Sequence, residues 1–477
     1  MVDITIRLRD NRNGEPGKGG NSGRRLIDAL REHPTFREED FERILNLLRR
    51  YENKTIEAWQ ILGLFVYSKG SSCLSSDEDG TYNELTVFSL GQDANVHSTW
   101  INTHNCMGVV RMMDMVAGVA IQLEIGSRFD DGKNQYFLNY LLSKVFGGNL
   151  VGEIEVGNDS FWEMLLAFAF RHRLQEACKV GLFKEFRRAQ YNDLRFRGKM
   201  DLDTHLRFNI PFRGRLAYEA HEITFDNPLN HLIRHAFERI ARKWRAILSG
   251  SKEITDLRHQ FDQNTPTWHH GGVLDCMRKN IRSVKQPYFR RYYEPLRKVS
   301  LAILRRFGAG LYGKAEEAEG IIFDGSWLWE NYLWTLLQPL GFQHPDNKRQ
   351  KGGWKILNKT FYPDFYYNSS ELRIVLDAKY KGEDRGIEDI RQVLAYMFMS
   401  DAKHGGLIKP VQSTQSLSKN ENIQCSGEWR GKWHDLFFCI PKASNPREYL
   451  IGISKAELDL KNAAVFRELP TSARLGS

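Results

Sequence analysis

The stretch FYPDFYYNSSELRIVLDAKYK, residues 361–381, decides how this sequence is interpreted. It contains two runs rich in aromatic and branched apolar residues, FYY and LRIVLDAKY, separated by the polar turn signal NSS. This pattern predicts two neighbouring strands joined as a β-hairpin. Asp377 and Lys379 are two residues apart, so on a strand they point to the same face. They are unexpected there, because a lone charge on a buried strand is costly.

A divalent metal ion would account for these charges. Asp364 follows Pro363 at the start of the first strand, and Asp377 lies on the second. Together with the main-chain carbonyl of Ala378, their carboxylates are the hard oxygen ligands that Mg²⁺ prefers, and Mn²⁺ could take its place. Lys379 would then orient or deprotonate a water molecule that attacks a phosphodiester, while the metal stabilises charge on the phosphate.

Two flanking helical runs add polar side chains to this set. SWLWENYLW before the hairpin carries Glu330, and the run after it carries Gln392 and Tyr396, four residues apart on one helical face. A bare Asp-x-Lys on a strand would favour an exposed ion pair instead. The larger set favours a metal-dependent nuclease site, with Glu330 as a further metal ligand; its expected catalytic members, in chain order, are Glu330, Asp364, Asp377, Lys379 and Gln392.

The bulk composition of the 477 residues is that of a soluble protein with two or three domains, 41% hydrophobic and 27% charged. No apolar run approaches the roughly 18–20 residues that span a bilayer, so we expect no membrane association. The first ten residues lack a signal-peptide pattern, and the six cysteines show no CxxC spacing. These features favour the reducing cytoplasm of a prokaryotic cell and argue against a zinc or disulfide framework.

Positive charge is concentrated in the middle of the chain. Residues 181–310 hold 26 Lys and Arg against 13 Asp and Glu, an excess of +13 within a net charge of +9. This indicates a surface that meets a polyanion, although solvated helical faces would give the same count. The run RGK could instead have a purely structural role, in which Gly198 forms a hairpin turn at a positive φ. The side chains we expect to contact DNA are Arg195, Arg197, Lys199, Lys381 and Tyr396.

The pattern along the chain predicts a multi-domain α+β protein. Residues 1–25 contain a run rich in Gly, Asn and basic residues and are expected to form a flexible tail. Residues 26–155 are expected to form a helical and β-rich domain, and residues 156–310 a mainly helical basic domain. Strands are predicted at 194–202 and 214–225 within a helical section. Residues 311–477 are expected to form an α/β domain with a mixed sheet and strands at 435–441 and near 449–453.

The hairpin constellation resembles the PD-(D/E)xK nuclease superfamily, with Asp364, Asp377 and Lys379 at its three signature positions. Glu330 is similar to the acidic residue of that family's first core helix, and Gln392 with Tyr396 to its QxxxY feature. Upstream, the segments 181–209 and 218–240 resemble the McrC family, the nuclease subunits of McrBC-type modification-dependent restriction systems. Across roughly 100–440 the resemblance implies a C-terminal restriction-endonuclease-like domain that cleaves DNA with Mg²⁺.

The resemblance also implies a partner. Nuclease subunits of this kind act with a McrB-like hexamer of AAA+ GTPase subunits that reads modified cytosine in duplex DNA, and their β-rich N-terminal part docks on the ring and stimulates it. The sequence contains no GxxxxGK[ST] motif, so we expect no nucleotide site in this chain. Two alternatives stay open: a stand-alone repair or recombination nuclease, and a non-catalytic subunit that activates the GTPase.

Overall fold

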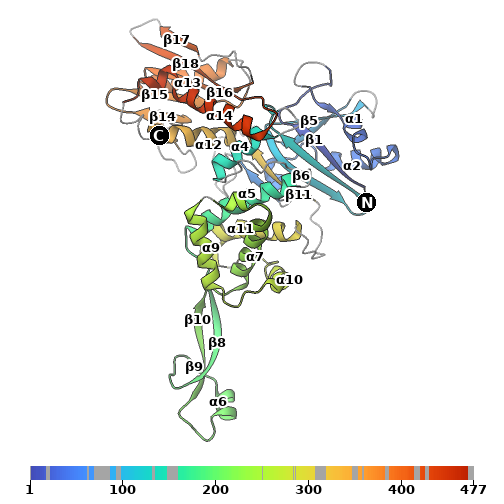
Figure 1. Ribbon diagram of the computed structural model, residues 1–477, viewed down its shortest axis with the longest axis vertical. Helices are drawn as coiled ribbons and strands as arrows, with labels where there is room; N and C mark the ends of the chain where they lie inside the picture. Colours follow the sequence, from blue (N-terminus) through green and yellow to red (C-terminus); the bar gives the residue numbers. More distant parts are fainter. Residues whose placement is uncertain are drawn as a thin grey trace. The chain divides into compact units, whose positions relative to one another are not determined.

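The computed structural model describes residues 2–17, 22–61, 64–68, 86–92, 98–130, 135–147, 160–249, 251–282, 284, 286–306, 318–345, 353–356, 359–381, 386–412, 419–424 and 429–470. The chain forms two compact units, one of Met1–Gly157 with Lys314–Ser477 and the other of Asn158–Gly313 (Figure 1). The second unit lies close to the expected middle domain, whose predicted boundaries near 155 and 310 are outside the described residues. The two outer parts of the chain, expected as separate domains, form one unit.

The N-terminal part of the first unit is built on a mixed five-stranded sheet in the order β1 (Val2–Arg9), β7 (Val119–Gly126), β6 (Cys106–Asp114), β11 (Ala318–Asp324) and β3 (Phe65–Tyr67). A smaller sheet contains β2 (Arg24–Arg25), β5 (Trp100–Thr103) and β4 (Phe88–Gly91). Helices α1 (Leu26–Arg31), α2 (Phe41–Tyr51) and α3 (Ile56–Ile61) complete this part, and α2 packs Ile44 and Leu48 into its core.

The expected flexible tail is wrong for its first residues. Val2–Arg9 form β1, which pairs in parallel with β7. The physical reason is the alternation of Ile4, Ile6 and Leu8, which places three buried side chains on one face of a strand. The glycine-rich composition that suggested a tail begins only after this strand.

Strand β11 belongs to the N-terminal sheet, although residues 311–477 were expected to form a separate domain. It pairs antiparallel with β6 and parallel with β3. Strands β6 and β11 approach each other closely at Gly108, whose φ is +136°. A Cβ atom at this position would lie 2.0 Å from the carbonyl oxygen of Ile321. Because helix α12 (Gly325–Leu337) follows β11 directly, the N-terminal sheet fixes where this helix begins.

The C-terminal part contains a second mixed five-stranded sheet in the order β14 (Phe365–Asn368), β15 (Arg373–Ala378), β16 (His404–Val411), β18 (Arg430–Cys439) and β17 (Lys419–Gln424). Helix α13 (Ile387–Ser400) packs on one face through Val393 and Met397. On the other face, Trp329 of α12 contacts Phe438 of β18. Helix α4 (Tyr136–Phe146) packs against α12, and the small elements β12 (Trp354–Ile356), β13 (Lys359–Phe361) and α15 (Ala464–Arg467) complete the part.

The strand predicted near 449–453 is wrong, because these residues lie in helix α14 (Pro446–Lys461). Asn445 caps the helix by accepting a hydrogen bond from the backbone N–H of Glu448, and Pro446 occupies the first turn. The buried residues Tyr449, Ile453 and Leu460 follow helical spacing, which outweighs the local β-like composition.

The second unit combines a helical body with a hairpin. The body contains α5 (Ser160–Cys178), α7 (Pro228–Lys243), α8 (Arg245–Leu248), α9 (Lys252–Asn264), α10 (Val273–Lys279) and α11 (Pro287–Arg306). The antiparallel strands β8 (Glu185–Asp193) and β10 (Leu216–Thr224) carry β9 (Lys199–Met200) and α6 (Leu202–Phe208) at their far end (Figure 1). The strand predicted at 194–202 therefore reduces to two residues. None of the described helices is long and apolar enough to cross a lipid bilayer.

Gly198 is required by close packing and not by a left-handed turn. Its φ lies outside the positive region, but a Cβ atom there would approach the carbonyl oxygen of Glu219 to 2.0 Å. The residue lets β9 pair with β10.

Candidate active site

The predicted hairpin of residues 361–381 is confirmed. Strands β14 and β15 pair antiparallel, with Phe365 opposite Leu376. Asp364 lies immediately before β14, and its Oδ2 accepts a hydrogen bond from the backbone N–H of Ala378 at 2.9 Å. Asp377 lies on β15 and is 2% exposed. The hairpin register therefore brings the two predicted carboxylates to the same end of the sheet.

Lys379 connects the hairpin to α13. Its Nζ lies 2.6 Å from Oδ2 of Asp377 and donates to Oε1 of Gln392 at 3.0 Å. Nε2 of Gln392 in turn donates to the hydroxyl of Tyr396 at 3.1 Å, so the four-residue spacing on α13 does place both side chains on the lysine's side. Sequence reasoning missed Asp389, whose Oδ1 lies 3.6 Å from the same Nζ. The signal was present, because Asp389 lies three residues before Gln392 on the same helix.

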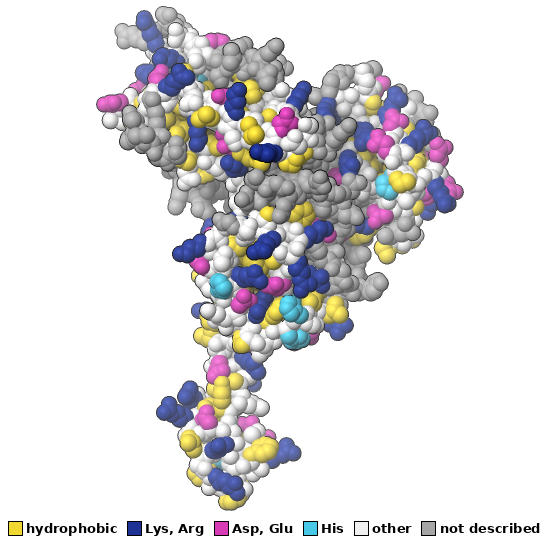
Figure 2. Space-filling view, viewed as in Figure 1, with side chains coloured by type: hydrophobic (Ala, Val, Ile, Leu, Met, Phe, Trp, Pro, Cys, Tyr) yellow, Lys and Arg dark blue, Asp and Glu magenta, His cyan; other side chains and the backbone are white. Residues whose placement is uncertain are grey.

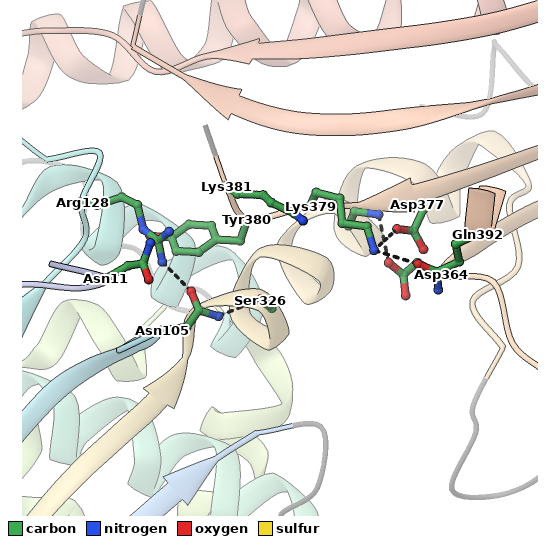
Figure 3. A pocket seen from close by; sticks show the side chains of 11 residues that line it. Asn11, Asn105, Arg128, Ser326, Asp364, Asp377, Lys379, Tyr380, Lys381 and Gln392 are labelled. Carbon is green, nitrogen blue, oxygen red and sulfur yellow. Dashed lines mark hydrogen bonds and ion pairs between the residues drawn. The ribbon is translucent and has the colours of Figure 1, made fainter. Parts of the chain in front are cut away.

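A pocket of about 360 Å³ is lined by Asp364, Asp377, Lys379 and Gln392 (Figure 3). One end is formed by the hairpin and α13, and the other by residues of the N-terminal sheet and the start of α12. The lining residues that the sequence analysis did not identify are Asn11, Asn105, Arg128, Ser326 and Tyr380. Apart from Tyr380, which lies beside Lys379, they come from segments far apart in the sequence that are brought together by the pairing of β1 with β7, of β7 with β6 and of β6 with β11.

Glu330 is buried at 6% exposure and is not among the residues that line the pocket. It lies 3.5 Å from Nε2 of His344, whose Nδ1 donates to the carbonyl oxygen of Asp364 at 2.7 Å. These contacts place Glu330 behind Asp364, where it supports the backbone of that residue through His344.

The residues expected to contact DNA are distributed over both units. Arg195, Arg197 and Lys199 are exposed at the far end of the hairpin of the second unit. Lys381 lines the pocket and pairs with Asp389 at 2.7 Å. Tyr396 is only 8% exposed, so its ring packs in the core and its hydroxyl holds Gln392 instead of offering a face for base stacking.

The electrostatics of the pocket keep Lys379 charged. Burial lowers the pKa of its ammonium group. Attraction by Asp377, and then by Asp364 and Asp389, raises this pKa by more than burial lowers it. The net pKa of Lys379 therefore lies above its usual value. For the Tyr396 hydroxyl, by contrast, burial raises the pKa, and the nearby carboxylates of Asp377 and Asp364 raise it as well. Both groups therefore keep their protons at neutral pH.

The carboxylates of the pocket are possible ligands for a divalent cation. Within the described ranges, no three His, Cys, Asp or Glu side chains converge as a metal-binding group. The pocket nevertheless offers the carboxylates of Asp364 and Asp377, and Mg²⁺ commonly binds one or two carboxylates and keeps several waters. Around this end, three carboxylates face two lysines, which leaves one negative charge in excess. The residues present fit a hydrated Mg²⁺ ion better than a fully protein-ligated one.

Comparisons with known proteins place these observations in context. A family model described as McrBC 5-methylcytosine restriction system component matches residues 101–410. The refined half-complex from a tetradecameric assembly of Thermococcus gammatolerans McrB AAA+ hexamers with bound McrC is similar at 14% identity and a TM-score of 0.42, covering 95% of this chain and 100% of that chain. The cryo-EM structure of the Thermococcus gammatolerans McrBC complex gives 15% identity and a TM-score of 0.28, covering 71% and 88%. No curated protein matches.

The structural likenesses have TM-scores below 0.5 and carry no argument of their own. The family match carries the conclusion, because it spans more than half of the 477 residues and includes the whole of the hairpin, α12 and α13. The chain therefore belongs to the family of McrBC 5-methylcytosine restriction system components.

Proposed function

We propose that this chain is the DNA-cleaving subunit of a modification-dependent restriction system and hydrolyses phosphodiesters with Mg²⁺. The observation that carries the proposal is the meeting of Asp364, Asp377, Lys379 and Gln392 in one pocket, at the end of a mixed sheet with helices on both faces. That arrangement agrees with the restriction-endonuclease-like domain that the sequence resemblance implies. The family membership supplies the biological setting.

Each residue has a role that follows from its contacts. Asp364 and Asp377 would hold the metal ion, together with the carbonyl of Ala378. When bound, Mg²⁺ or Mn²⁺ supplies Lewis-acid stabilisation of charge on the phosphate. Lys379 is fixed between Asp377 and Gln392, so we assign it to orienting the attacking water and neutralising charge, and not to abstracting a proton. Glu330 would act through His344 on Asp364.

The substrate we propose is duplex DNA carrying a modified cytosine such as 5-methylcytosine, in the cytoplasm. A McrB-like hexamer of AAA+ GTPase subunits would bring the DNA to this chain, and this chain would stimulate the GTPase. The absence of a Walker-type phosphate loop from the sequence supports a division of labour in which the nucleotide is hydrolysed by the partner.

The function is tested by cleavage of methylated and unmethylated plasmid, with and without the GTPase partner and GTP. We expect cleavage only of the methylated plasmid with partner, GTP and Mg²⁺, and complete loss when EDTA removes the metal. Equal cleavage of both plasmids by the chain alone would instead identify a stand-alone nuclease. GTPase stimulation without any cleavage would identify a non-catalytic activator.

The exposed apolar side chains of the described residues point to the hairpin of the second unit as the partner-binding surface. The hairpin end carries seven large apolar side chains that are each at least half exposed, and basic side chains gather there as well (Figure 2). They are Leu194, Phe196, Leu202, Leu206, Phe208, Ile210 and Phe212. On the N-terminal sheet, where docking was expected, the exposed large apolar residues are Met115 and Val116. Exposed apolar patches of this size mark interaction sites.

Replacing Phe208 and Phe212 with serine is expected to weaken binding to the GTPase hexamer at least about tenfold, because exposed aromatic anchors dominate interface energies. The measurement is the affinity of the purified chain for the GTP-loaded hexamer. Replacing Met115 and Val116 with serine is the matched control and should leave the affinity unchanged. If the Met115 and Val116 replacements weaken binding and the Phe208 and Phe212 replacements do not, the partner binds the N-terminal sheet instead.

A further inference from the structure

Arg128 is held in one orientation at the end of the pocket formed by the N-terminal sheet (Figure 3). Asp10, which is fully buried, accepts hydrogen bonds from Nε at 3.0 Å and from Nη2 at 2.6 Å. The guanidinium group also lies over the ring of Tyr380, 4.8 Å from its centroid. An arginine fixed by a carboxylate and an aromatic ring loses little further freedom when it binds a ligand.

The fixed guanidinium keeps unused donors. Its hydrogen bonds to Asp10 use Nε and Nη2, and Nη2 also donates to Oδ1 of Asn105 at 2.5 Å. Over the described part of the chain, no residue accepts from Nη1. Arg128 lines the pocket with 12% of its side chain exposed, so these two N–H groups are the ones left for a ligand there.

Asn11 adds a second donor from the same sheet. It lines the pocket and has a φ of +51°, in the left-handed region that residues other than glycine seldom adopt. Its backbone N–H donates to the carbonyl of His104 at 2.9 Å, which ties this conformation to the neighbouring turn. Held backbone conformations of this kind cluster at sites that bind ligands. The structure thus keeps the Asn11 amide at the edge of the pocket.

Arginine side chains lie close together at this end of the pocket. The pKa of Arg12 is lowered by burial and then by repulsion from Arg9 and Arg128, while Asp10 opposes the shift. Arg12 and Arg128 therefore both attract the buried carboxylate of Asp10. At the opposite end, three carboxylates surround Lys379 and Lys381. The end of the pocket formed by the N-terminal sheet is thus lined by the Arg128 guanidinium, and the end formed by the hairpin is lined by carboxylates.

We propose that Arg128 and Asn11 form a phosphate subsite. This subsite binds a backbone phosphate of the DNA that lies next to the phosphate that is cleaved. The inference rests on the proposed function and adds a binding residue from a part of the chain that carries no nuclease motif. Tyr380 ties the two ends together, because it stacks under Arg128 while its neighbours Lys379 and Lys381 face the carboxylates. A phosphate on Arg128 would thus set the position of the strand relative to Lys379.

The test measures DNA binding by the full chain in EDTA, which separates binding from cleavage. Duplexes carry one neutral methylphosphonate linkage, moved one position at a time along each strand. For the wild-type chain, we expect one position at which the neutral linkage weakens binding about tenfold. For Arg128→Gln, binding should be weaker by a similar factor, the salt slope of log K should fall by about one, and the same linkage should cost nothing further.

Matched variants separate this role from a structural one. Arg111→Gln removes an arginine of the same sheet that is 14% exposed and pairs with Asp3 at 2.6 Å, and it should leave binding and salt slope unchanged. Asn11→Gly keeps the positive φ and removes the amide, so it should lose part of the same linkage effect. If Arg128→Gln fails to fold beside the buried Asp10, the pair Asp10→Asn with Arg128→Gln and the Asn11→Gly variant carry the test.

The subsite is refuted if the neutral linkage weakens binding equally in the wild-type chain and in the Arg128 and Asn11 variants, or if no position weakens wild-type binding. Failure of the proposed function looks different. If the chain shows the linkage effect in EDTA but never cleaves DNA with Mg²⁺ and the partner, the phosphate subsite is supported and the proposed nuclease function is wrong.

Discussion

Replacing Asp377 with asparagine is expected to reduce DNA cleavage on the order of 10³-fold while leaving the fold and the partner complex intact. Asparagine has nearly the same volume, so the buried strand β15 keeps its packing. The substitution removes a negative charge from the metal-binding end and the ion pair to Lys379 at 2.6 Å. The measurement is the single-turnover cleavage rate with partner, GTP and saturating Mg²⁺, alongside hexamer binding.

The control for this variant is Asp389→Asn. Asp389 is another buried carboxylate beside Lys379, at 3.6 Å, but we do not place it among the metal ligands. Its loss should slow cleavage only about tenfold, by weakening the orientation of the two neighbouring lysines. A chain with Asp377→Asn that cleaves at the wild-type rate would contradict the assignment. Equal losses in both variants would show that the ion pair, and not metal binding, is what Asp377 provides.

Replacing Lys379 with glutamine is expected to reduce cleavage by about 10²- to 10³-fold, because it removes the only cation fixed between Asp377 and Gln392 in the described pocket. Lys379→Arg keeps the charge and should lose only about tenfold. A lysine that acts as a fixed cation stays charged throughout the reaction, so the wild-type rate should show no inflection from Lys379 between about pH 6 and pH 9.

The measurement is the cleavage rate as a function of pH for the three proteins. If the wild-type rate rises through neutral pH with an inflection that disappears in both Lys379→Gln and Lys379→Arg, then Lys379 abstracts a proton from water and its role as a fixed cation is wrong, because arginine keeps its proton throughout this range. Activity of Lys379→Gln at the wild-type level would remove the residue from the site altogether.

The sequence predicted the hairpin and its carboxylates because both depend on local patterns. Two short runs of aromatic and branched apolar residues with a turn signal between them give β14 and β15, and a two-residue spacing gives the pairing of Asp377 with Lys379. Helical spacing likewise predicted that Gln392 and Tyr396 share one face of α13. What these elements have in common is that the interacting residues lie on one strand, one helix or one hairpin.

The other half of the pocket could not be predicted, because it depends on long-range strand pairing. β11 follows the second unit in sequence but completes a sheet begun by β1, and the pairing within this sheet brings together the segments that carry Asn11, Arg128 and Ser326. Glu330 was expected at the metal for a related reason. Its position on α12 shows that it is near the hairpin, but helix spacing does not show that His344 lies between it and Asp364.

The most direct test of the central claim is a crystal structure of the chain with Mn²⁺, whose anomalous scattering locates the metal. We expect one peak in contact with carboxylate oxygens of Asp364 and Asp377, at about 2.0–2.2 Å, and no peak in crystals of Asp377→Asn grown and soaked in the same way. A wild-type structure in which the pocket stays free of Mn²⁺ while Lys379 remains paired with Asp377 would contradict the account.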